Sequence, residues 1–90
     1  MLKIVFTNEY TRRSKRFFKQ HPELVDRYKK VMKLLSLDPS NSVLRLHKLK
    51  GSMKNLYSVS LNFSYRIILM FIIEDGVIIP VNIGSHDQVY

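Results

Sequence analysis

The sequence predicts a single α+β domain in which a helical hairpin packs on a small, mainly antiparallel sheet, in the order β-α-α-β-β-β. Apolar residues recur at helical spacing up to about residue 37 and at strand spacing from about residue 55 onward. Such a switch is typical of a fold with segregated helices and strands. The chain has 90 residues, of which 46% are hydrophobic and 24% charged, which suits one modest core. We therefore treat residues 1–90 as one domain.

The first half of the chain is predicted to hold one strand and two helices. Residues 2–6 are β-rich, and Thr7 or Asn8 can cap a helix over about 8–20. A second helix is expected over 22–37, because it begins with proline, which suits a first helical turn. The apolar positions of both helices recur at spacings of three, four, seven and eight: Tyr10, Phe17, Phe18, Leu24, Tyr28, Val31, Met32 and Leu35.

The second half is predicted to hold three strands, over 55–62, 65–73 and 77–83. The first alternates, with a buried face of Tyr57, Val59 and Leu61 and a polar face of Ser58, Ser60 and Asn62. The other two are joined by Asp75-Gly76, a favoured hairpin pair. Pro80 cannot donate to a ladder, so we expect it at a bulge or with its nitrogen facing away from a neighbouring strand.

The charge of the chain favours a polyanionic partner. Lys and Arg number 15 against seven Asp and Glu, giving a net charge of +8 and a pI near 10. The Lys and Arg residues form three clusters along the sequence. The two clusters in the predicted helices are equally well explained as solvated helix faces. A third cluster lies in a predicted loop around His47, where no helical face has to be solvated. It supplies candidate cations for binding a polyanion, which could be a nucleic acid, an anionic membrane or an acidic protein: Arg45, Lys48, Lys50 and Lys54.

The composition gives no indication of a metal, a cofactor or a membrane anchor. The chain has no cysteine, and its three histidines are far apart in sequence. The longest apolar run is too short to span a bilayer. We expect a cytoplasmic protein that uses neither a metal nor a small-molecule cofactor.

The C-terminal residues 84–90 place a histidine, His86, and a terminal tyrosine, Tyr90, directly after a fully apolar run. Such a polar, titratable tail is not needed for packing, which favours a chemical role, because histidine titrates nearest neutrality. The alternative is a solvated tail.

Three motifs occur together in this chain: the run His47-Lys48-Leu49-Lys50-Gly51, the start of the central strand at Ser64-Tyr65-Arg66-Ile67-Ile68, and the ending from Ile83 to Tyr90. In this order and spacing they resemble the RelE/ParE toxin superfamily of bacterial toxin–antitoxin modules. The resemblance covers the whole chain and implies the β-α-α-β-β-β fold. The RelE branch implies an endoribonuclease that cleaves messenger RNA, typically in the ribosomal decoding (A) site, without a metal.

The resemblance also implies the catalytic residues. Arg66 matches the strand arginine of the family, His86 a position that carries a catalytic arginine or histidine, and Tyr90 the terminal aromatic residue. His47 resembles the loop histidine of the YafQ-like branch. The chain departs from the family on the strand that often carries lysines or a histidine, because it has Ser58 and Ser60 there.

The residues themselves suit RNA cleavage without a metal. Attack of the 2′-hydroxyl on its own phosphodiester needs a base, an acid and a cation for the phosphorane charge. Either His47 or His86 can be the base and the other the acid, while Arg66 clamps the phosphate. Tyr65 or Tyr90 can stack on a base, and Ser60 lies on the polar face of its strand. For Arg66, the alternative is a structural ion pair with an acidic residue such as Asp87.

Two other functions remain open from the sequence. The ParE branch inhibits DNA gyrase by binding and performs no RNA chemistry, and a plain basic nucleic-acid-binding module would also carry this charge. A messenger-RNA nuclease needs an inhibitor in its own cell. We therefore expect a cognate acidic antitoxin that folds on binding the basic surface.

Overall fold

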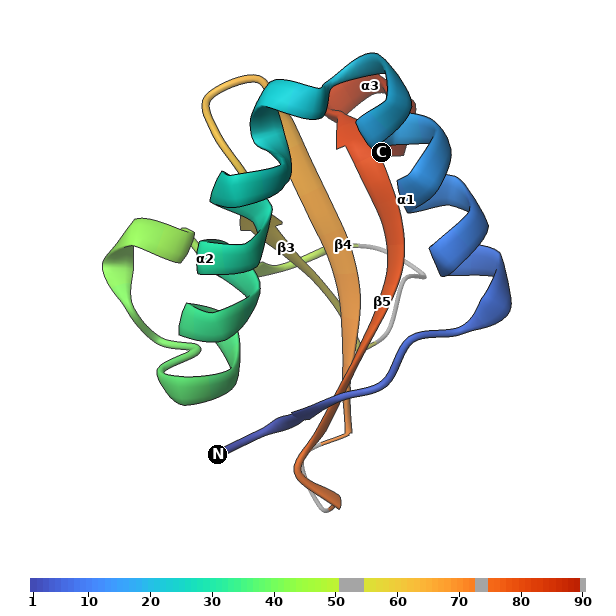
Figure 1. Cartoon of the computed structure of the whole chain (residues 1–90). Coiled ribbons are helices and arrows are strands. Elements are labelled where there is room, and N and C mark those ends of the chain that lie inside the picture. The colour runs from blue at the N-terminus through green and yellow to red at the C-terminus, as the bar shows by residue number, and fades with distance from the viewer. Residues whose placement is uncertain (51–54, 73–74, 90) are drawn as a thin grey trace.

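The sheet of the computed structural model has five strands in the order β1-β5-β4-β3-β2. The model describes residues 1–50, 55–72 and 75–89. Only β1 and β5 run parallel among the described strands, so the sheet is mainly antiparallel, as predicted (Figure 1). The strands are β1 (Lys3–Ile4), β2 (His47–Lys48), β3 (Leu56–Ser60), β4 (Tyr65–Ile72) and β5 (Val77–Ser85).

The helices begin and end close to the predicted residues. Helix α1 spans Asn8–Gln20, and Thr7 caps it by accepting a 3.0 Å hydrogen bond from the backbone N–H of Tyr10. Helix α2 spans Val25–Leu37 and follows a 3₁₀ turn at Pro22–Leu24. Both helices cover one face of the sheet (Figure 1). A further 3₁₀ turn (Ser42–Leu44) precedes β2, and a single helical turn, α3 (His86–Val89), follows β5.

The core lies between the helices and the sheet. Its buried members come from both layers and include Tyr10, Phe17, Leu24, Val31, Met32, Leu35, Leu44, Val59, Leu61, Ile67, Leu69, Ile78 and Ile83. Tyr28 and Tyr57 are partly buried against the same cluster, as the spacing predicted. The α+β class is therefore confirmed, and the predicted elements occur in the predicted order, with β2 and α3 as additional elements.

Pro80 lies at a bulge, one of the two positions that the sequence analysis allowed. Ile68 is opposite Asn82 and Leu69 is opposite Pro80, so β5 has an extra residue, Val81, at this point. A bulge interrupts the hydrogen-bond ladder between the strands, so β5 does not need a backbone N–H donor at Pro80, which has none.

Three expectations for the second half were wrong. Strand β5 runs to Ser85, because β4 continues to pair with it beyond residue 83. Residues 47 and 48 form an edge strand rather than a loop, because they pair with β3. Ser58 is 0% exposed, so the face predicted to be polar and wet is dry at this position.

A buried pair of phenols joins the two helices. The hydroxyl oxygens of Tyr10 and Tyr28 are 2.9 Å apart. The pKa of Tyr10 is raised far above its ordinary value of 10.0. Burial is the largest cause, and the nearby Tyr28 is the second. Burial also raises the pKa of Tyr28. Both phenols therefore stay protonated in the folded protein at pH values where the unfolded chain ionises.

This pair predicts an alkaline loss of stability. The folded pKa values are raised, so the stabilisation is fully present below about pH 10 and is lost as the pH rises above it. Tyr28→Phe should cost about 1–3 kcal/mol at pH 7, because the Tyr10 hydroxyl is left buried without that partner. Urea unfolding between pH 7 and 11 measures both effects. The double variant Tyr10→Phe/Tyr28→Phe is the control and should flatten the alkaline slope; an unchanged slope would contradict the assignment.

Candidate active site and basic surface

The sheet has a second face, opposite α1 and α2, and Arg66 lies on it. Its neighbours Tyr65 and Ile67 both pack on the helix side, the first against Phe17 and the second in the core. Successive residues of a strand point to opposite faces. Arg66 therefore points away from the helices.

Strand register defines which residues share this second face. One row across the sheet contains Ser60, Arg66 and Gly84, because Arg66 is opposite Ser60 on β3 and Gly84 on β5. The next row contains His47, Ser58, Ile68 and Asn82. Arg66, Ser60 and His47 thus lie on the same face of the sheet, as a shared site requires.

The guanidinium of Arg66 is half-buried and incompletely paired. Its Nη1 atom is shielded from solvent and has no hydrogen-bond partner among the described residues. The alternative ion pair with Asp87 is not formed in this part of the chain: the Asp87 carboxylate is fully exposed and lies 3.8 Å from Nδ1 of His86. A shielded N–H donor without a partner suits an anionic ligand, because a buried unpaired cation is otherwise costly.

Helix α3 brings His86 to the same end of the sheet. A Cβ atom on Gly84 would lie only 2.8 Å from Oε1 of Gln88 and 3.3 Å from Cγ1 of Val89, so α3 packs over Gly84 on the face that carries Arg66. Glycine suits this position because the turn approaches the strand closely, and a larger residue would require Gln88 and Val89 to shift. The His86 side chain is 65% exposed.

A capping box holds α3 in place. The backbone N–H of Gln88 donates to Oγ of Ser85 at 3.3 Å, and the side-chain oxygen of Gln88 accepts from the backbone N–H of Ser85 at 2.8 Å. This reciprocal Ser-x-x-Gln pattern fixes a helix start. Its signal is present in the sequence, where the expected feature was a polar, titratable tail rather than a helical turn.

His47 is exposed on the edge strand β2, and its Nδ1 is 3.1 Å from the backbone carbonyl oxygen of Arg45. His47 is directly opposite Ser58, two residues along β3 from the row that contains Arg66. It is placed at the rim of the face, one strand beyond Ser60.

Other predicted site residues are not brought together with Arg66. Tyr65 points to the helix side, where its ring centroid is 5.1 Å from that of Phe17 and 4.7 Å from that of His21. Lys48 is opposite Tyr57, which packs toward Phe71 and the core, so it lies on the helix side as well. Lys50 is exposed just beyond β2. The predicted residues Lys54 and Tyr90 lie outside the described residues.

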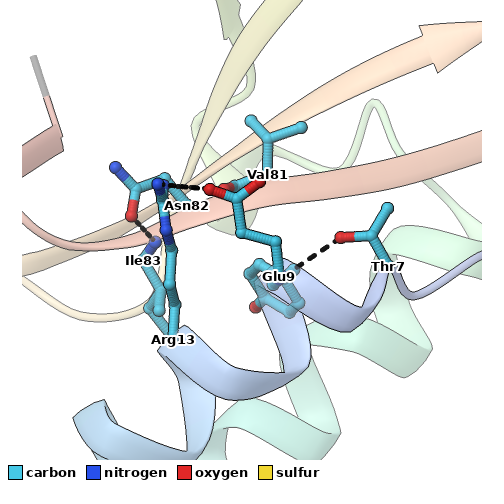
Figure 2. A network of polar contacts seen from close by, with 7 residues as sticks. Thr7, Glu9, Arg13, Val81, Asn82 and Ile83 are labelled. Carbon is cyan, nitrogen blue, oxygen red and sulfur yellow. Dashed lines mark hydrogen bonds and ion pairs between the residues drawn. The ribbon is translucent and has the colours of Figure 1, made fainter.

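A basic hollow that the sequence analysis did not single out lies between α1 and β5. It has a volume of about 410 Å³. Arg13 is held there by Glu9 at 2.7 Å and by the carbonyl oxygen of Val81 at 3.4 Å (Figure 2). The lining side chains include Arg13, Arg16, Phe17, Gln20, Asn82 and Gln88. The spacing of Arg13 and Arg16 places them on one helix face, but only the docking of α1 on β5 turns that face into a hollow.

The described residues show neither a metal cluster nor a membrane-spanning helix. No group of three or more His, Asp or Glu side chains among them is arranged to hold a metal ion. No helix in the described ranges is long and apolar enough to cross a bilayer.

The overall structure is similar to solved toxin structures. YafQ from E. coli strain BL21(DE3) superposes with a TM-score of 0.80 at 18% identity, covering 100% of this chain and 99% of that one. A chain of the E. coli DinJ-YafQ toxin-antitoxin complex superposes with a TM-score of 0.80 at 22% sequence identity, covering 99% of this chain and 97% of that one. The chain has the RelE/ParE toxin fold. A YoeB/ParE toxin from Agrobacterium tumefaciens superposes with a TM-score of 0.75 at 15% sequence identity, covering 94% of this chain and 99% of that one.

The RelE/ParE fold covers the full length of the chain, so the resemblance found in the sequence motifs is confirmed for the fold. No protein-family model and no curated protein sequence matches the chain.

Proposed function

We propose that this protein is the toxin of a bacterial toxin–antitoxin module and acts as an endoribonuclease on messenger RNA, without a metal. The observation that carries the proposal is the shielded Nη1 atom of Arg66, which has no hydrogen-bond partner among the described residues. Arg66 lies on the face that also carries His47, next to the helix that carries His86. The RelE/ParE fold supports it, because YafQ and YoeB have the same architecture.

The proposed reaction is attack of the 2′-hydroxyl on the adjacent phosphorus. One histidine, His47 or His86, takes the proton of the 2′-hydroxyl while the new P–O bond forms. The bond from phosphorus to the 5′ oxygen breaks, and the other histidine gives that oxygen a proton. Arg66 stabilises the negative charge that builds on the phosphorane oxygens. The products are a 2′,3′-cyclic phosphate and a 5′-hydroxyl end.

The proposed partners follow from the same comparison and from charge. The DinJ-YafQ and YoeB-YefM structures are complexes, and we propose a cognate antitoxin for this chain as well. Its net charge of +8 suits an acidic antitoxin segment. The substrate is messenger RNA, with the ribosomal A site as the place where it is presented.

Mapping of RNA ends tests the function. The protein is incubated with a messenger RNA, with and without ribosomes, and the new ends are identified chemically. We expect 2′,3′-cyclic phosphate ends, and no cut where a 2′-deoxynucleotide replaces the cleaved one. A parallel gyrase supercoiling assay covers the ParE-like alternative. Inhibited supercoiling together with intact RNA would overturn the nuclease assignment.

A further inference from the structure

Phe63 is presented to solvent at the tip of a well-ordered turn between β3 and β4. Its side chain is 96% exposed. The side-chain oxygen of Asn62 accepts hydrogen bonds from the backbone N–H groups of Ser64 and Tyr65, at 2.9 and 2.8 Å. Leu61 donates a further 2.9 Å hydrogen bond to the carbonyl oxygen of Tyr65. The exposed ring is therefore held by a closed turn rather than by a loose loop.

Two arginines border a hollow beside this ring, and the described residues that line it include no acidic one. The Arg45 guanidinium carbon is 6.0 Å from the centre of the Phe63 ring. Arg27 is anchored by a 2.7 Å hydrogen bond from its Nε to the carbonyl oxygen of Leu61. Together they border a hollow of about 310 Å³, and among the described residues its lining includes no Asp or Glu. The lining is Arg27, Ser42, Val43, Arg45, Ser60, Asn62 and Phe63.

The hollow begins one strand away from Arg66. Ser60, which lines it, is the direct partner of Arg66 across the β3–β4 ladder. Neighbouring strands are about 4.8 Å apart. A nucleic-acid strand with its phosphate at Arg66 therefore reaches the hollow with an adjacent nucleotide.

We propose that the hollow at the β3–β4 turn binds a nucleotide of single-stranded RNA next to the cleaved bond. The base stacks on Phe63, and the phosphate is bound by Arg45 and Arg27. An exposed aromatic ring beside guanidinium groups provides both parts of a stacking platform. An acidic peptide would pair with the arginines but would leave the ring without a planar partner. The inference rests on the proposed function, because it assigns a subsite that adjoins the Arg66 face at Ser60.

The test uses an RNA that cannot be cleaved, a fully 2′-O-methylated single strand of about eight nucleotides. Phe63→Ala should weaken its binding about 5–150-fold, the range found for loss of one stacked base. Leu37→Ala, which removes another exposed apolar side chain at the end of α2, should leave the affinity unchanged. Phe63→Trp should retain affinity. Because the chain has no tryptophan, the quenching of its single indole reports stacking directly.

Arg45 is tested by its salt dependence. It has φ 50°, a left-handed conformation that asparagine tolerates, so Arg45→Asn removes the cation with little backbone strain. Its affinity should fall and the slope of log affinity against log salt should decrease by about one. Lys33→Gln removes a charge outside the hollow and is the control.

The outcomes separate the two proposals. If the unmutated protein binds and cleaves RNA while Phe63→Ala and Arg45→Asn bind as well as it does, the subsite is wrong and the nuclease function stands. If the unmutated protein neither binds the 2′-O-methyl strand nor cleaves messenger RNA, both are overturned. If the two variants lose affinity for an acidic antitoxin and none for RNA, the surface is a protein interface and the subsite is overturned.

Discussion

Arg66→Met is expected to lower the rate of RNA cleavage by about 10²–10³-fold, the usual cost of removing one donor to transition-state charge. The same change should leave the free energy of unfolding equal or about 1 kcal/mol higher. The reason is that Arg66 stands in an apolar strand with a shielded N–H group that has no partner among the described residues, and replacing such a cation by an apolar side chain of similar volume is often stabilising. A functional residue and a structural one therefore differ in the sign of the stability change.

Two controls make this prediction sharp. Ile68→Met alters the buried residue two positions along β4, on the same face, and should leave cleavage unchanged. Arg66→Lys keeps the charge and loses the planar fork, so its cleavage rate should lie between those of the unmutated protein and Arg66→Met. Cleavage rates and urea midpoints are measured on each variant. An Arg66→Met protein that cleaves normally and unfolds at lower urea would show that Arg66 is a structural residue.

The helices could be predicted because their signals are local. Thr7 supplies a side-chain cap and Pro22 a restart, and the structure has both at those residues. Pro80 also carried its own signal, since the missing N–H excludes it from a regular ladder. Each of these predictions needed only the residue and its neighbours in sequence.

The errors concern features that depend on pairing across the chain. The edge strand at His47–Lys48 exists only because β3 offers it a partner, and nothing in its two residues indicates this. Ser58 is fully buried, although the alternation of its strand is typical of a half-exposed one. The basic hollow needs α1 to dock beside β5, a tertiary contact that spacing does not predict.

Part of the site could have been placed more accurately from the sequence. Alternation along a strand assigns Tyr65 to the face opposite Arg66, which excludes a shared surface for these neighbours. The Ser85-x-x-Gln88 pattern indicates a helix start before His86. Both signals were present, and the structure shows their consequences.

His86→Ala is expected to lower the rate of RNA cleavage by about 10²–10⁴-fold, the usual contribution of a general acid or base. The free energy of unfolding should change by less than about 0.5 kcal/mol, because the side chain is exposed. The matched control is His21→Ala. The His21 ring is half-buried, with its centroid 4.6 Å from that of Phe17 and 4.7 Å from that of Tyr65, so its loss should lower stability and leave cleavage by the folded protein unchanged.

The pH dependence then assigns the two histidines. With one histidine as base and the other as acid, the unmutated protein should show a bell-shaped profile of cleavage rate against pH. Removing the base abolishes the dependence on the acidic limb, and removing the acid abolishes it on the alkaline limb. His47→Ala and His86→Ala should therefore each flatten a different limb of the residual activity. If both variants keep a bell-shaped dependence of cleavage rate on pH, other groups perform the proton transfers. His86 is then an exposed residue of a solvated turn and has no chemical role.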